Sequence, residues 1–198
     1  MRALTLLTLA ALGRAATVPR SVADGIYGVS LDARGQEVHT RLPDRGNLTS
    51  PQDLSTYDRR EERHNLGRTV DDLNTYCTCN VDLKVRDTDD AVIDLRFQLG
   101  PGGKKFDFMS VYSKRGNVVA FACKDPKFQW AQATGNDLGL VMHAIGARCG
   151  RYVESSANFK VKEDGTKSAI TFGIMRLDSP DLDFCAKATA SPKSTCVH

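Results

Sequence analysis

NVVAFAC at residues 117–123 and LGLVMHAIGARCG at residues 138–150 decide the fold of this chain. The first stretch is an almost continuous apolar run, which predicts a strand in the centre of a sheet. In the second stretch apolar residues recur every three or four positions, which predicts an amphipathic helix that ends before Gly150. Cys149 lies on the apolar stripe of this helix, so a disulfide from it would hold the helix against the sheet.

Another strand and another helix are predicted upstream of this pair. Apolar and polar residues alternate over 81–85, as in a half-buried strand. Residues 87–88 offer a helix N-cap, apolar residues then recur at helical spacing up to Leu99, and the sequence GPGG at 100–103 ends the run. The change of period therefore predicts a strand followed by a short amphipathic helix.

Two hairpins complete the predicted core. The first has its turn at 114–117, between the apolar residues around Val111 and the central strand, and the second joins strands over 152–161 and 169–175. The resulting order is β, α, β, β, α, β, β. It predicts an α+β fold in which an antiparallel sheet carries two helices packed on one face, as a two-layer sandwich stabilised by disulfides.

The N-terminal segment predicts export. Met1 and Arg2 precede the apolar run ALTLLTLAAL at 3–12, and small residues follow at 13–16. This pattern is typical of a cleaved secretory signal peptide. The run is about half the length that a membrane span needs. We therefore expect a signal peptide over 1–16 and a secreted, extracellular protein without a membrane span.

The residues after the signal peptide divide by composition into a leader and a domain. Runs of β-prone residues at 25–31 and 36–40 predict a hairpin near the start of the leader. Apolar residues thin out from Arg41 to about Thr75, as they do in linkers. We therefore predict a leader and linker over 17–75, and a cysteine-rich α+β domain over 76–198.

The predicted linker contains two sites of processing. Arg59 and Arg60 form a dibasic pair, which secretory-pathway proteases cut in exposed segments, although two arginines that solvate a loop would look the same. Asn47 begins the sequon Asn47-Leu48-Thr49, which predicts a glycosylation site in a chain that passes through the eukaryotic secretory route.

The cysteine count predicts crosslinks and no metal. All six cysteines lie downstream of the signal peptide, and an even number in an exported chain predicts three disulfides. One residue separates the first two cysteines, fewer than a zinc finger needs, so we predict neither a metal nor a cofactor. The pairing stays open among Cys77, Cys79, Cys123, Cys149, Cys185 and Cys196.

No catalytic residue is assigned from the sequence. Of the four histidines, His39, His64, His143 and His198, only His143 lies in a strongly predicted element, and it lies off the apolar stripe of its helix. A ribonuclease would need a second histidine, or a glutamate such as Glu154, beside it. The sequence has no nucleophile elbow, phosphate loop or dinucleotide fingerprint.

The order of elements and cysteines resembles a family of fungal proteins. The residues that carry the resemblance are 90–92 with Leu95, 117–123, 149–153, 171–175 and 183–185. In this order the chain resembles the small secreted cysteine-rich proteins of filamentous fungi, in particular the killer-toxin-like proteins and the related necrosis-inducing effector domain. The resemblance implies a secreted effector, but it implies no functional residue, because the toxins have more cysteines.

Three functions follow as expectations. The first is a secreted effector or toxin-like protein that acts as a monomer by binding a host or competitor protein or a cell-surface component; entry into host cells stays open. The alternatives are a cell-wall-binding or structural protein and a small secreted ribonuclease-like hydrolase. A nucleic-acid partner is not implied, because 27 Lys and Arg against 24 Asp and Glu leave a formal net charge of only +3.

Overall fold

The computed structural model describes nine stretches of the chain. They are 16–19, 21–44, 73–101, 104–106, 108–127, 131–163, 166–177, 183–189 and 194–196. The strands are β1 (Gly25–Leu31), β2 (Glu37–Arg41), β3 (Asn74–Asp82), β4 (Lys104–Phe106), β5 (Ser110–Arg115), β6 (Val118–Lys124), β7 (Ala131–Ala133), β8 (Val153–Glu163) and β9 (Thr166–Arg176). The helices are α2 (Val85–Leu99), α3 (Gly135–Cys149) and α4 (Phe184–Lys187).

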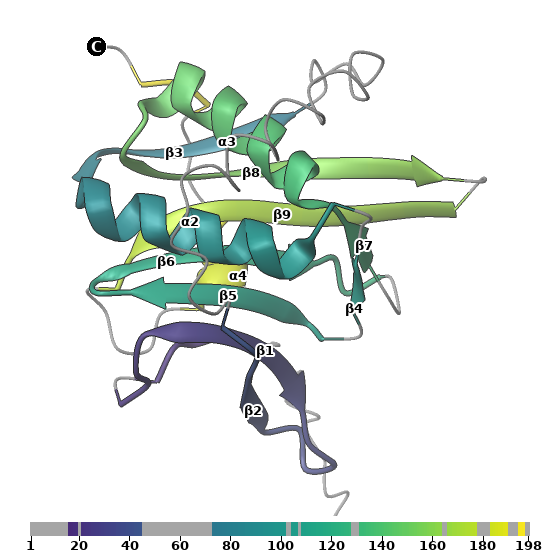
Figure 1. Cartoon of the computed structure of the whole chain (residues 1–198). Coiled ribbons are helices and arrows are strands. Elements are labelled where there is room, and N and C mark those ends of the chain that lie inside the picture. Colours follow the sequence, from purple (N-terminus) through teal and green to yellow (C-terminus); the bar gives the residue numbers. More distant parts are fainter. Residues whose placement is uncertain are drawn as a thin grey trace, which may run out of the picture.

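A seven-stranded antiparallel sheet forms the centre of the molecule (Figure 1). Its strand order is β2-β1-β5-β6-β9-β8-β3, and β4 pairs with β7 in a separate small ribbon. The antiparallel α+β fold predicted from the sequence is thus confirmed. β6 lies between β5 and β9, and its first six residues are all buried, which is why that stretch reads as a continuous apolar run.

The predicted N-terminal hairpin belongs to the same sheet. β1 pairs with β2 through the turn that Gly35 closes with a φ of +78°, and the other edge of β1 pairs with β5. Ile26 and Val29 are fully buried on opposite faces of the sheet. The sheet therefore extends beyond residues 76–198, the range that composition assigns to the domain.

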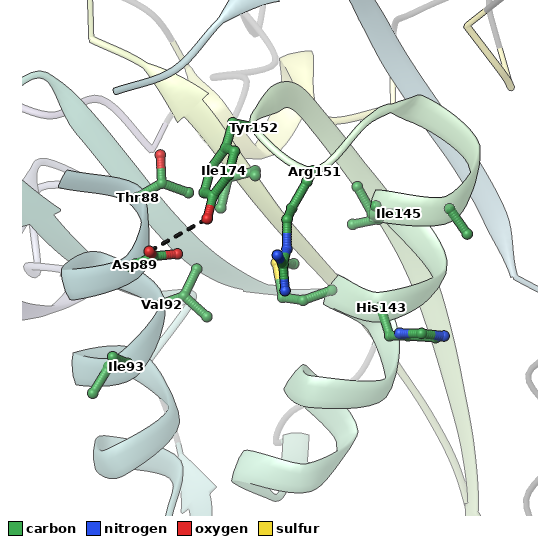
Figure 2. Close-up of a pocket in the computed structure, with 12 residues that line it drawn as sticks. Thr88, Asp89, Val92, Ile93, His143, Ile145, Arg151, Tyr152 and Ile174 are labelled. Carbon is green, nitrogen blue, oxygen red and sulfur yellow. Dashed lines mark hydrogen bonds between the residues drawn. The ribbon is translucent and has the colours of Figure 1, made fainter. Parts of the chain in front are cut away.

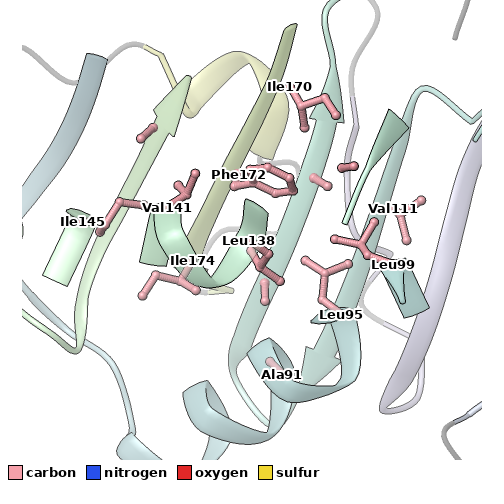
Figure 3. Close-up of a cluster of buried hydrophobic side chains, with 14 of the residues drawn as sticks. Ala91, Leu95, Leu99, Val111, Leu138, Val141, Ile145, Ile170, Phe172 and Ile174 are labelled. Atoms are coloured by element: carbon pink, nitrogen blue, oxygen red, sulfur yellow. The ribbon is translucent and has the colours of Figure 1, made fainter. Parts of the chain in front are cut away.

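Helices α2 and α3 pack side by side on one face of the sheet (Figure 3). Leu95 of α2 and Leu138 of α3 are fully buried there against Phe172 of β9. Thr134 caps α3, because its hydroxyl accepts a hydrogen bond from the Asp137 amide while the Asp137 carboxylate accepts one from the Thr134 amide. Both predicted helices are therefore present and lie on one face of the sheet, as the sequence predicts.

The predicted boundary between β3 and α2 is wrong. The strand predicted over 81–85 lies earlier, because β3 ends at Asp82, and α2 begins at Val85 rather than at residues 87–88. Val85 is 53% exposed and belongs to the first turn of the helix. The alternation over 81–85 arises because Leu83 is buried just after the strand, with its amide bonded to the Tyr152 carbonyl at 2.7 Å.

Short segments cover the opposite face of the sheet. Phe184 of α4 is buried between Tyr112 and Phe121, with ring centroids 5.6 Å and 5.2 Å apart. Ala16 and Val18 are buried in the same cluster. This cover explains why β6 is buried on both faces, and it adds a short helix that the sequence reasoning did not include.

All six cysteines are paired. Cys77 in β3 bonds Cys149 at the end of α3, Cys79 bonds Cys196, and Cys123 in β6 bonds Cys185 in α4, with Cα atoms 5.4 Å, 5.6 Å and 5.7 Å apart. The predicted disulfides are thereby confirmed, including the link that holds α3 to the sheet. Each crosslink joins a strand to a segment that covers the sheet or to the C-terminal segment.

Gly173 in β9 leaves room for the side chain of Phe121, its partner on the neighbouring strand β6. A Cβ added there would overlap the Phe121 ring and would lie 2.8 Å from the carbonyl oxygen of Ser155. Because neither the buried ring nor the backbone can move freely, we expect Gly173→Ala to lower the free energy of unfolding by about 1–3 kcal/mol. Urea unfolding followed by circular dichroism measures the loss.

Gly139→Ala in α3 is the control for this substitution. A Cβ at Gly139 would lie 3.7 Å from the Arg96 guanidinium carbon, an ordinary contact. In a helix the added methyl should raise stability by about 0.5–1 kcal/mol. If Gly173→Ala were as stable as the native chain, the close packing of β9 against β6 would be contradicted.

Candidate functional site

A groove opens between α2 and α3 on the helical face (Figure 2). Its volume is about 670 Å³. The lining comes from both helices, from the turn after α3 and from β9. The lining residues are Thr88, Asp89, Val92, Ile93, Met142, His143, Ile145, Gly146, Ala147, Arg151, Tyr152 and Ile174.

Most of the groove surface is apolar. Ile145 and Ile174 are buried at its base, while Val92, Ile93 and Met142 are half-buried on its walls. Ile174 comes from β9, whereas the others belong to the apolar stripes of α2 and α3 and lie at the edge of each stripe, where the two helices diverge. Gly146 has no side chain to fill the gap, so the groove stays open at that level.

The C-terminal end of α3 supplies the polar end of the groove. Gly150 caps the helix with a φ of +106°, and the turn it makes directs the next two residues back toward α2. The Tyr152 hydroxyl donates a long hydrogen bond to Asp89 Oδ2, at 3.4 Å. One carboxylate of the groove is thus already engaged by a hydroxyl.

The Arg151 side chain extends into the space between the helices (Figure 2). Within the described stretches its guanidinium makes no ion pair and no hydrogen bond to the protein. It therefore offers a planar set of donors, next to an apolar surface, to whatever occupies the groove. A carboxylate is the group that matches this geometry best.

His143 does not gain an acid–base partner in the groove. The residue is exposed, and Figure 2 shows its ring directed away from the Asp89–Tyr152 pair. Glu154 lies on the opposite face of the sheet, where its carboxylate binds Lys187 Nζ at 3.0 Å and accepts a hydrogen bond from the Arg176 amide. The sheet therefore separates the histidine and the glutamate that a ribonuclease would need together.

A second polar cluster lies near the edge of the sheet that β2 forms. The Tyr112 hydroxyl lies 3.1 Å from His39 Nδ1, and His39 Nε2 lies 3.5 Å from Glu37 Oε2. Burial raises the pKa of the fully buried Tyr112, and the nearby Tyr27 and Glu37 raise it further, so the hydroxyl keeps its proton and shares a hydrogen bond with His39. This cluster ties β2 to β5.

The structure does not test the predicted glycosylation and processing sites. Asn47, Arg59 and Arg60 lie outside the described residues, as do His64 and His198. Glycosylation and dibasic processing therefore stay predictions.

Sequence reasoning missed the main groove residues. Arg151 and Tyr152 directly follow the Cys-Gly end of α3. That position could have indicated groove residues, because a turn after a helix projects its side chains beside the helix end. No pattern in the sequence indicated that Asp89, which is distant in the chain, lies next to Tyr152.

Comparison of the chain with protein-family models, with curated proteins and with solved structures found no match. Among the residues that the structure describes, no helix is both long and apolar enough to cross a membrane. The same residues contain no cluster of three or more His, Cys, Asp or Glu side chains arranged to hold a metal ion.

Proposed function

We propose that this protein is a secreted effector or toxin-like protein that acts by binding a partner protein in the groove between α2 and α3. The observation that carries the proposal is Arg151, a guanidinium without an ionic partner in the described structure, placed at the polar end of a mostly apolar groove. The partner is a protein segment of a host or competitor that presents an apolar side chain next to a carboxylate.

The composition of the groove supports a protein partner. Met, Tyr and Arg are enriched at the centres of protein interfaces, and Met142, Tyr152 and Arg151 occur together here. An apolar anchor would cover Ile145 and Ile174 at the base, and a neighbouring carboxylate would reach Arg151. Asp89 makes no ion pair with Arg151 within the described stretches, and its hydrogen bond is to Tyr152.

The crosslinked frame supports action outside the cytosol. The disulfides join residues separated by 72, 117 and 62 positions, and such bonds persist in oxidising compartments. The Cys77–Cys149 bond fixes the C-terminal end of α3, directly before the turn that contains Arg151. A fixed turn lowers the entropy cost of binding, because the backbone of Arg151 and Tyr152 is already placed.

Two glycines of α3 provide a matched test of the groove. Gly146 lines it, and Gly139 does not. An added Cβ would meet its nearest neighbour at 3.8 Å at Gly146 and at 3.7 Å at Gly139, so a Cβ makes only ordinary contacts at either position. We expect Gly146→Leu to abolish cell death, immune modulation or growth inhibition by the purified protein, and Gly139→Leu to leave that activity unchanged.

The measurement is a dose series of each purified, exported protein on plant tissue and on competing microbes. Thermal unfolding of both variants checks that they fold, and leucine should stabilise the helix relative to glycine in each by about 0.5–1 kcal/mol. Equal activity of the two variants would contradict binding through the groove. Inactivity of the native protein at micromolar concentration would count against the whole proposal.

A further inference from the structure

The first described residues are part of the folded structure. Ala16 is only 2% exposed, and its carbonyl accepts a hydrogen bond from the Phe184 amide at 3.0 Å. Thr17 forms a β-bridge with Asp183, and Val18 is buried in the cluster that also contains Phe184. Removal of Ala16 together with the signal peptide would therefore remove a packed residue from the face of the sheet opposite α2 and α3.

Glu37 faces this segment from β2. The Thr17 amide and the Thr17 hydroxyl both donate to Glu37 Oε2, at 3.1 Å and 2.9 Å, and His39 Nε2 lies 3.5 Å from the same oxygen. The other oxygen, Oε1, is buried and has no hydrogen-bond partner among the residues that the structure describes. A half-satisfied carboxylate at this depth is costly unless a further donor reaches it.

We propose that signal peptidase cuts between Ala15 and Ala16, and that the α-ammonium group this creates pairs with Glu37 Oε1. Water hydrolyses the Ala15–Ala16 amide bond, which leaves a carboxylate on Ala15 and an amine on Ala16 that takes up a proton. The new ammonium adjoins the Thr17 amide that already binds Glu37. The site is a modification site of the exported chain, so it rests on the export part of the proposed function.

The sequence around the cut agrees with this position. A cut after Ala15 has Gly13 and Ala15 at the two places where signal peptidase requires small residues. A cut after Ala16, at the end of the signal peptide predicted from composition, would have Arg14 at one of them. The cut lies one residue earlier and keeps Ala16.

Cleavage thereby stabilises the docked position of the N-terminal segment. In the precursor the Ala16 nitrogen is an amide with one hydrogen and no charge, whereas in the cleaved chain it is a cation with three donors. Only the cleaved chain satisfies both oxygens of Glu37, which in turn positions His39 and Tyr112. The N-terminal segment should therefore dock more firmly after export than before it.

The test starts from the full precursor, expressed in a eukaryotic secretion host. Intact mass of the exported product identifies its first residue, which we expect to be Ala16. The reaction of the N-terminal amine with an acetylating reagent is then followed at neutral pH by peptide mass spectrometry. Each unit by which pairing raises the pKa of the amine slows this reaction about tenfold.

We expect the native amine to react at least about tenfold more slowly than the amine of Glu37→Gln. Asp44→Asn is the control, because Asp44 is an exposed carboxylate that pairs with Arg41. A chain with one glycine added before Ala16 provides a second test that does not alter Glu37, and its amine should react at the rate of an ordinary N-terminus.

Three results would overturn the inference or its premise. An exported chain that begins at another residue overturns the cut site, and an Ala16 amine that reacts equally fast in the native chain and in Glu37→Gln overturns the pairing. Both leave groove binding intact, because Ala16 and the groove lie on opposite faces of the sheet. A chain that stays in the cell overturns export itself, on which both proposals rest.

Discussion

Replacing Arg115 with methionine is expected to lower the free energy of unfolding by about 3 kcal/mol, because it leaves a buried carboxylate without its main cation. Asp94 of α2 is fully buried, and Arg115 Nε donates to Asp94 Oδ2 at 2.5 Å. The pair fixes α2 against the end of β5. Urea unfolding of the native protein and of Arg115→Met gives the difference.

Lys114→Met is the matched control on the same strand. Lys114 Nζ lies 2.6 Å from Asp24 Oδ1, but the Asp24 side chain is 45% exposed, so loss of this pair should cost less than about 1 kcal/mol. The double variant Asp94→Leu/Arg115→Met should regain most of the lost stability, since an apolar pair needs no charge compensation. Equal losses for Arg115→Met and Lys114→Met would contradict the structural role of Asp94.

Removal of the Cys77–Cys149 disulfide should have an effect of similar or larger size. The bond closes a segment of 72 positions, and both cysteines are buried. Chain entropy alone then predicts that Cys77→Ala/Cys149→Ala lowers the free energy of unfolding by about 4 kcal/mol. Because the bond also holds the end of α3, the variant should lose the placement of Arg151 and with it the groove activity.

Unfolding of the double variant and its activity on plant tissue measure these two effects. Cys123→Ala/Cys185→Ala is the comparison, because that bond links β6 to α4 on the opposite face of the sheet. It should lower stability without changing groove activity at a temperature where both variants are folded. A stability loss below about 1 kcal/mol on removal of Cys77–Cys149 would contradict a crosslinked frame.

The sheet and the two long helices were predictable from particular residues. The run at 118–123 predicts a strand buried on both faces, and the spacing from Leu138 to Cys149 predicts the inner face of α3. Both patterns are local, and burial against the rest of the core agrees with them. The α2 boundary was not predictable in the same way, because Leu83 is buried after the end of β3, where its amide bonds the Tyr152 carbonyl.

The pairing of the cysteines and the candidate groove depend on contacts between distant residues. Nothing near Asp94 in the sequence indicates that Arg115 compensates it, and nothing near Asp89 indicates Tyr152. The attachment of β1 to β5 is another contact of this kind, since composition places the hairpin in a leader. Sequence patterns show which face of an element is buried, but they do not show which other element covers it.

Binding of peptides to the groove is the most direct test. Peptides selected on the exported protein from a random display library should share an apolar residue next to Asp or Glu, and their affinities are then measured by fluorescence anisotropy. A charge-assisted hydrogen bond contributes about 1.5–3 kcal/mol, so Arg151→Glu should weaken binding at least about tenfold. Gly146→Leu should abolish it and Gly139→Leu should not. Selected peptides that bind the Arg151→Glu and Gly146→Leu variants as tightly as the native protein would show that the groove is not the binding site.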